Sequence, residues 1–261
     1  MIQKPKKKLG QHFLTSPEII DTIVNAVSPS KGEIIVEIGA GQGAITDPFS
    51  NVSSELHAIE YDRDLTTLLR KRFSKRKNVT IHEANVLEFN FSSLGNQLRL
   101  IGNLPYNIST PILFYILLFE DHISDMHFML QKEVADRLCA IPGNKNYGRL
   151  SIMIGCRIEI IKLFDVAPEA FNPRPKVISS VVRMRPQPKG KFNYFIKDNL
   201  NKIVKLGFSK RRKKLYNALA PLITSSQIKK LNINPNCRPE EISIQEWIEL
   251  SEILNNQQCQ H

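Results

Sequence analysis

The stretch EIIVEIGAGQG, residues 33–43, decides the fold of this chain. Its first six residues form a β-rich run of the kind found in β-strands, and Gly39, Gly41 and Gly43 follow at once. Glycine tolerates positive φ angles and lets a ligand approach the backbone closely. The pattern predicts a strand of a parallel sheet that ends in a nucleotide-type binding loop.

Further β-rich runs extend outward from this strand, with amphipathic helical patterns between them. Ser16 and Pro17 are typical of a helix start, and they predict a helix ahead of the first strand. This alternation is typical of an α/β fold with a mostly parallel sheet. The predicted strands cover residues 33–38, 55–59, 78–82, 98–102, 125–130, 157–163 and 177–184.

After Pro186 and Pro188 the pattern changes to helices only. A capping box, Ser243 with Glu246, opens the last of them. We therefore predict an α/β domain over residues 1–188 and a small all-helical domain over residues 189–261. The predicted helices of the second domain cover residues 192–206, 209–222, 225–231 and 244–254.

The composition excludes several classes of protein. The longest apolar run, Ile112–Phe119, is far shorter than the ~20 residues of a membrane span. The four cysteines lie at wide, irregular spacings, and the six histidines show no metal-ligand pattern. We expect a cytoplasmic protein without a membrane segment, a disulfide framework or a metal site.

The positive charge is concentrated in one band. The formal net charge is +11, and residues 174–214 carry 14 Lys and Arg side chains against one acidic residue, Asp198. A smaller basic cluster, Lys4, Lys6, Lys7 and Lys8, opens the chain. Clustered basic side chains bind polyanions by neutralising phosphates, although such a run can also be a solvated face. The density of charge favours a nucleic-acid partner.

Polar residues follow the predicted strands at the edge where ligands bind in such sheets. Glu60 lies 21 residues after Gly39, a spacing at which a carboxylate can accept hydrogen bonds from both ribose hydroxyls. Asn85 and Asn103 end the next two strands. The glycine loop and Glu60 alone also fit an NAD-dependent oxidoreductase, and the loop alone also fits a plain tight turn.

The motif Asn103-Leu104-Pro105-Tyr106 suggests chemistry on a planar amine. A side-chain amide oxygen and a backbone carbonyl held before a proline can both accept from an exocyclic NH2 group. A tyrosine ring offers a stacking face for a base. The alternative is a turn at the strand end with a capping Asn and a core Tyr.

Together these motifs closely resemble those of the KsgA-type family of small-subunit rRNA adenine N6,N6-dimethyltransferases, which use S-adenosylmethionine (SAM). The resemblance implies a class I, Rossmann-like methyltransferase sheet. Related macrolide-resistance methylases of large-subunit rRNA share part of the pattern, whereas the later motifs favour the KsgA type. The resemblance rests on GQHFL (10–14), VEIGAGQG (36–43), NLPYNISTP (103–111), MLQKEVADR (129–137), YGRLS (147–151), APEAFNPRPKVISSVVRMR (167–185) and FSKRRK (208–213).

The resemblance assigns residues to the cofactor. It implies that the glycine loop passes the methionine moiety, that Glu60 holds the ribose and that Asn85 faces adenine, where the family usually has Asp. The product would be S-adenosylhomocysteine. The residues implied in cofactor binding are His12, Leu14, Gly39, Gly41, Glu60, Asn85 and Asn103.

The resemblance also implies the reaction. Asn103, Leu104, Pro105 and Tyr106 would hold the target adenine, with Phe171 beside it; a hydrophobic plug is the alternative for Phe171. The activity would be N6 dimethylation of two adjacent adenosines in the 3′-terminal hairpin loop of 16S rRNA during ribosome biogenesis. The partner would be the small subunit, and we expect a monomer. A non-catalytic ribosome-assembly factor is a further alternative.

The basic band supplies the predicted RNA-binding residues, which are Lys210, Arg211, Arg212 and Lys213. Both arginines are predicted to lie on one face of a helix begun by Ser209.

Overall fold

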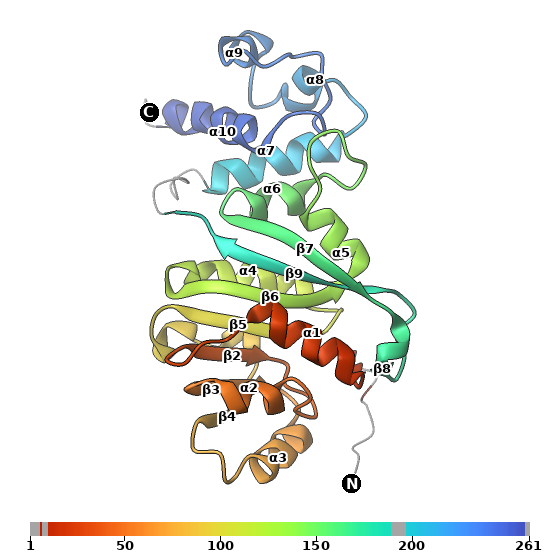
Figure 1. The fold of residues 1–261 in the computed structure, drawn as a ribbon. Coiled ribbons are helices and arrows are strands. Elements are labelled where there is room, and N and C mark those ends of the chain that lie inside the picture. The colour runs from red at the N-terminus through yellow and green to blue at the C-terminus, as the bar shows by residue number, and fades with distance from the viewer. Residues whose placement is uncertain (1–5, 7–9, 189–196, 259–261) are drawn as a thin grey trace. The chain divides into compact units, whose positions relative to one another are not determined.

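The computed structural model describes residue 6, residues 10–188 and residues 197–258. The chain divides into two compact units (Figure 1). The first comprises Met1–Ala135 and Ile161–Pro186, and the second comprises Asp136–Ile160 and Gln187–His261. The break after residue 186 lies close to the predicted boundary. The second unit also takes in residues 136–160, which the sequence analysis places in the first domain.

A seven-stranded sheet has the order β4-β3-β2-β5-β6-β9-β7. The five strands from β4 to β6 pair in parallel, whereas β9 runs antiparallel to β6. All seven predicted strands are confirmed, as is the α/β class. Their bounds are β2 (Ile34–Ile38), β3 (Glu55–Glu60), β4 (Val79–Glu83), β5 (Leu98–Asn103), β6 (Ile123–Gln131), β7 (Ile158–Val166) and β9 (Ser179–Pro186).

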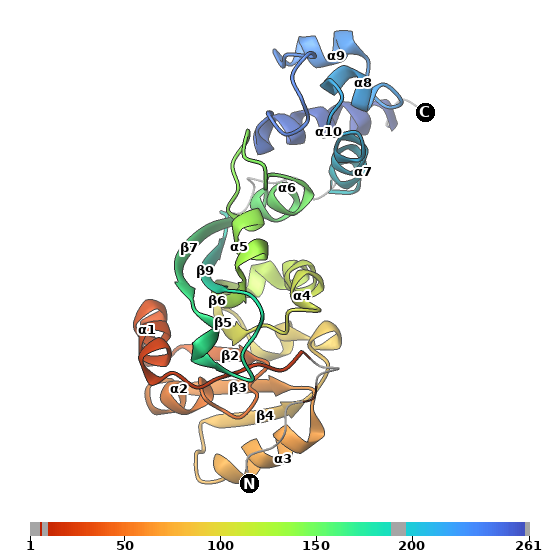
Figure 2. The same ribbon diagram turned by 90° about the vertical axis from the view of Figure 1, so that its right-hand side faces the viewer.

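Helices cover the sheet on both faces (Figure 2). The predicted first helix is confirmed as α1 (Pro17–Val27), where the Ser16 side chain accepts from the Ile19 amide. Its buried residues Ile23 and Val27 pack into a core cluster with Ile35 of β2. The other helices in this part of the chain are α2 (Thr46–Val52), α3 (Arg63–Arg72), α4 (Ser109–Ile116) and α5 (Lys132–Leu138), with 3-10 turns η2 (Val86–Glu88), η3 (Phe91–Leu94), η4 (Leu117–His122) and η5 (Pro168–Ala170).

A two-stranded ladder that the sequence did not predict joins β1 (Phe13–Leu14) to β8 (Phe171–Asn172). The two strands are antiparallel, and the Thr15 amide continues the pairing to the Ala170 carbonyl at 2.8 Å. This ladder fixes the segment that carries the GQHFL motif.

The second unit is helical around a buried tryptophan. Trp247 is fully buried, and its ring lies 5.8 Å from that of Phe208 between centroids. The capping box is confirmed, because the Ser243 amide donates to Glu246 and the Glu246 amide donates to the Ser243 hydroxyl. The helices are α6 (Arg149–Gly155), α7 (Lys197–Ser209), α8 (Leu215–Leu219), α9 (Ser225–Lys230) and α10 (Ile244–Gln258).

The predicted helix over residues 209–222 is confirmed only for Leu215–Leu219, which form α8, and its predicted start at Ser209 is wrong. Ser209 ends α7, and its hydroxyl donates back to the Leu206 carbonyl at 2.7 Å instead of capping a new helix. Residues 210–214 form a turn in which the Lys213 amide donates to the Lys210 carbonyl. Of the predicted helix over 192–206, residues 192–196 lie outside the described part of the chain.

In the described residues, no helix is long and apolar enough to cross a membrane. Within the same ranges, no group of three or more His, Cys, Asp or Glu side chains is arranged to hold a metal ion.

Candidate active site

A cavity of about 330 Å³ opens at the carboxyl ends of β2, β3, β4 and β5 in the first unit. Its volume falls within the range of small-molecule sites, which is roughly 300–1,000 Å³. The glycine loop, the GQHFL segment and the NLPY motif all reach it, although they are far apart in sequence. The wall is formed by residues 10–14, 37–42, 44, 45, 59–61, 65, 84–87 and 103–108.

The glycine loop turns sharply beneath the cavity. Gly39 and Gly41 have φ angles of +74° and +57°, which residues with a side chain rarely adopt. A Cβ atom at Gly41 would lie 3.1 Å from the Phe13 ring. The loop thus provides bare backbone where the sequence predicts the approach of a nucleotide-type ligand.

Glu60 ends β3 with its carboxylate at the cavity. One oxygen accepts from the Gly41 amide and the other from the Asp62 amide, each at 2.8 Å. Burial raises the pKa of Glu60 above its usual value, although these backbone hydrogen bonds oppose the rise. Each carboxylate oxygen can accept a second hydrogen bond, so the group can receive a pair of hydroxyl donors.

Asn103, at the end of β5, presents an unsatisfied acceptor. Its Nδ2 donates to the His12 carbonyl at 2.9 Å, whereas its buried Oδ1 has no hydrogen-bond partner. A buried polar atom without a partner costs free energy, on the order of 1–3 kcal/mol. Because Asn103 lines the cavity, this oxygen is suited to accept from a bound amine.

Tyr106 lies against His12 in the wall of the cavity. The two rings stack with centroids 5.5 Å apart, and the Tyr106 hydroxyl hydrogen-bonds the Ser179 hydroxyl at 2.6 Å. Burial raises the pKa of Tyr106, so it remains a phenol at neutral pH. His12 Nδ1 lies 2.7 Å from the Pro173 carbonyl, which makes that nitrogen the donor. Leu104 and Pro105 line the same wall.

One predicted site residue, Phe171, lies outside the cavity, whereas Leu14 and Asn85 line it and also have structural roles. Phe171 lies in the core cluster with Leu14 and does not line the cavity, because the pairing of β8 with β1 turns its side chain inward. Leu14 belongs to both that core and the cavity wall. Asn85 lines the cavity but caps η2, since its Oδ1 accepts from the Leu87 amide at 3.1 Å and its Nδ2 donates to Glu88.

The predicted RNA-binding residues lie in the turn after α7. Arg211 is engaged within the second unit, where it pairs with Glu240 and donates to the Lys145 carbonyl at 2.7 Å. This corrects the expectation that Arg211 extends from a helix face as a free phosphate contact. Lys210 is half-buried, whereas Arg212 and Lys213 are exposed.

Glu37 and Tyr61 are two of the cavity residues that the sequence did not single out. Glu37 is buried beside the glycine loop, and its carboxylate accepts from the Thr46 hydroxyl at 2.5 Å. Tyr61 follows Glu60 and is 65% exposed, so its ring is available to a ligand in the cavity. Glu37 could have been noticed as a charged residue inside an apolar strand, whereas nothing in the local pattern marks Tyr61.

Glu37 predicts a pH dependence of stability. Burial, opposed by the Thr46 hydrogen bond, raises its pKa from 4.5 to about 8. The folded chain therefore keeps a proton that the unfolded chain releases, and stability falls as pH rises from about 4.5 to about 8. The fall is at most ~1.4 kcal/mol per pH unit. Glu37→Gln should remove this slope in urea unfolding at pH 5, 6.5 and 8. A stability difference from the parent that stays constant with pH would contradict the assignment.

Comparisons with known proteins show the family to which this chain belongs. A family model described as ribosomal RNA adenine dimethylase matches residues 2–256. The chain belongs to the ribosomal RNA adenine dimethylase family. It is 46% identical to ribosomal RNA small subunit methyltransferase A of Nitrosospira multiformis, over 98% of each chain. It is 44% identical to the protein of that name from Dechloromonas aromatica, over 96% of this chain and 98% of that one.

Solved structures support the fold of a ribosomal RNA adenine dimethylase. A dimethyladenosine transferase from Plasmodium falciparum has a TM-score of 0.83 at 23% identity, covering 95% of this chain and 98% of that chain. The 23S rRNA methyltransferase ErmE has a TM-score of 0.74 at 21% identity, covering 93% of this chain and 99% of ErmE. The predicted family, fold class and enzyme class are confirmed. The NAD-dependent alternative is not supported.

Proposed function

We propose that this chain transfers methyl groups from SAM to the N6 amines of two adjacent adenosines in the 3′-terminal hairpin loop of 16S rRNA, with S-adenosylhomocysteine as the product. The observation that carries the proposal is the unpartnered Asn103 oxygen in the cavity wall, which offers an acceptor to an amine. The small-subunit names of the 41–46% identical relatives favour the small subunit over the large.

The residues present fit SAM. The bare backbone at Gly39 and Gly41 leaves space for the methionine part, and the Glu60 carboxylate can accept from the ribose hydroxyls. The Tyr61 ring and the Asn85 side chain line the part of the wall next to Glu60, where adenine would lie. Bound SAM supplies an electrophilic methyl group on a sulfonium.

The protein's contribution to the reaction is to orient the target amine. The lone pair of adenine N6 is delocalised into the ring, so the amine is a poor nucleophile. Hydrogen bonds from N6 to the Asn103 oxygen and to the Leu104 carbonyl favour a pyramidal nitrogen with its lone pair freed. The Tyr106 ring, held by Ser179 and His12, provides the stacking face for a flipped base. The methylated ammonium is acidic and loses its proton readily, so we assign no general base.

We further propose that the α/β unit carries the chemistry and that the helical unit, acting in a cytoplasmic monomer, recognises the rRNA. Within the turn after α7, Arg212 and Lys213 are the exposed members of the predicted RNA-binding set. Each could neutralise a phosphate without giving up a contact that holds the fold.

The double variant Arg212→Glu/Lys213→Glu should weaken binding to small-subunit rRNA while the melting temperature stays the same. The slope of log K against log salt should become less steep by about one for each lost phosphate contact. Filter binding over a series of salt concentrations measures this slope. Lys229→Glu/Lys230→Glu, at exposed residues of α9, carries the same change in charge and should leave the slope unchanged. Equal slopes for both variants would show that the turn is a solvated face.

The proposed substrate is tested by labelled methyl transfer from SAM to separated ribosomal subunits that lack the modification. We expect label in the small subunit only. Label in the large subunit would instead favour the macrolide-resistance type of reaction. Binding without any transfer would favour a non-catalytic assembly factor.

A further inference from the structure

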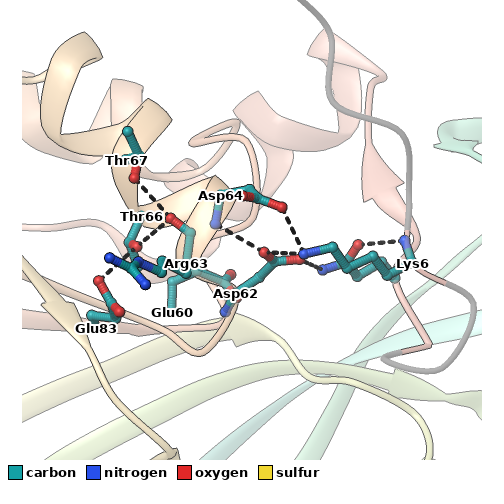
Figure 3. Close-up of polar contacts among 9 residues, drawn as sticks. Lys6, Glu60, Asp62, Arg63, Asp64, Thr66, Thr67 and Glu83 are labelled. Carbon is teal, nitrogen blue, oxygen red and sulfur yellow. Dashed lines mark hydrogen bonds and ion pairs between the residues drawn. The ribbon is translucent and has the colours of Figure 1, made fainter.

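Asp62 connects the N-terminal segment, the end of β3 and the start of α3 (Figure 3). It is almost fully buried, and its Oδ1 caps α3 by accepting from the Asp64 amide at 3.0 Å. Lys6 Nζ donates to the same carboxylate at 2.7 Å and to Asp64 at 2.8 Å. Gln11 Nε2 donates to the other oxygen, Oδ2, at 3.1 Å. The Asp62 amide also donates to Glu60, so the cluster adjoins the cavity.

Gln11 immediately precedes His12, whose carbonyl accepts from Asn103 Nδ2. On one side of His12, the Gln11–Asp62 hydrogen bond holds the backbone against the start of α3. On the other side, the β1–β8 ladder and the Thr15–Ala170 hydrogen bond hold it against β8. The His12 carbonyl is thereby fixed between two anchors that lie on different elements.

This carbonyl determines which way the Asn103 amide points. A side-chain amide has a donor end and an acceptor end, and rotation by 180° exchanges them. While the His12 carbonyl takes the donor end, the oxygen must face away from it, as the unpartnered Oδ1 does. If the carbonyl moved away, the amide could present its NH2 group to the target amine, which is also a donor.

We propose that Gln11 and Asp62 are positioning residues that, through the His12 carbonyl, keep the Asn103 oxygen directed at the target amine. This inference rests on the proposed function, in which Asn103 accepts from adenine N6. The conformation of the segment before β1 would then affect the rate of methyl transfer directly, because a small misplacement of a catalytic group lowers the rate strongly.

Asp62 has two roles: it caps α3 and it accepts a hydrogen bond from Gln11. The cap stabilises the helix without any contribution from Gln11. The variant Gln11→Glu separates the two roles, because it leaves the cap intact and places a second carboxylate against Asp62. Burial alone would raise the pKa of Asp62, but hydrogen bonds from Lys6 and Gln11 hold it below its usual value, so the carboxylate is ionised at neutral pH. The two like charges should push residue 11 and the His12 carbonyl out of place.

For Gln11→Glu we expect kcat to fall by about ten- to hundredfold, with melting temperature little changed; SAM and RNA are kept saturating for each variant, so that a change in SAM affinity does not enter the measured rate. The matched control is Gln11→Glu/Asp62→Asn, which has the parental net charge. In it, the side-chain amide introduced at position 62 can donate to the carboxylate introduced at position 11, while its oxygen still caps α3. This double variant should recover most of the lost kcat. A parental kcat in Gln11→Glu, or no recovery in the double variant, would overturn the inference.

A second measurement does not depend on turnover. The side-chain amide resonances of Asn103, assigned by their loss in Asn103→Ala, should shift or broaden in Gln11→Glu and return in the double variant. Unchanged resonances in Gln11→Glu would refute the inference while leaving the proposed function intact. If Asn103→Ala itself turns over at the parental rate, the role of Asn103 in the proposed function fails instead, and the two failures are distinguishable.

Discussion

Asn103→Ala is expected to lower the rate of methyl transfer by two orders of magnitude or more, which corresponds to about 3 kcal/mol of lost transition-state stabilisation. The reason is geometric: the variant removes the unpartnered oxygen that the cavity offers to an amine. The loss should appear in kcat under single-turnover conditions. Affinity for SAM should stay within about tenfold, because Glu60 and the glycine loop remain in place.

The matched control for this variant is Asn51→Ala. Asn51 is an exposed asparagine of α2 outside the cavity wall, and its loss should leave the rate of transfer near the parental value. Turnover by Asn103→Ala at the rate of this control would show that the oxygen does not orient the amine.

Gly102→Ala is expected to destabilise the first unit by about 3 kcal/mol or more, at the upper end of overpacking effects. A Cβ atom at this position would lie 2.3 Å from the carbonyl oxygen of Ile38. The clashing oxygen is a backbone atom of β2, which pairs with β5 through residues 35–37. No side chain can therefore rotate away to relieve the clash. The same close approach sets Asn103 next to the glycine loop, so the variant should also lose activity.

The midpoint of urea unfolding measures this effect. Gly148→Ala is a suitable control, because its Cβ would lie 3.8 Å from the Phe208 ring and its backbone is extended. We expect that control to change stability by less than about 1 kcal/mol. A Gly102→Ala variant that unfolds at the parental midpoint would contradict the described approach of β5 to β2.

The sheet and the cavity could be predicted from the sequence because both follow from local patterns. Parallel strands bring their carboxyl ends to one edge, so Gly39, Glu60 and Asn103 meet there although they are far apart in the chain. The β1–β8 ladder could not be predicted, since each strand has only two residues and their pairing is long-range. That pairing is also what places Phe171 in the core.

Other features that the sequence did not predict also depend on long-range contacts. Residues 209–222 have the apolar spacing of one helix, but the contacts of Arg211 with Glu240 and Lys145 hold residues 210–214 in a turn. The link from Asp62 to Gln11 spans 51 positions and leaves no periodic signal in the sequence. Of the basic cluster that opens the chain, Lys4, Lys7 and Lys8 lie outside the described residues, and Lys6 pairs with Asp62 and Asp64.

Nucleoside analysis of small-subunit rRNA tests whether this chain dimethylates adenosine through Asn103. Subunits lacking the modification would be incubated with SAM and either the parental protein or Asn103→Ala, digested, and assayed for N6,N6-dimethyladenosine. We expect two dimethyladenosines per subunit with the parental protein, both in the 3′-terminal hairpin, and only traces with the variant. Methyl groups on another atom or at another site, or no dimethyladenosine with the parental protein, would contradict this expectation.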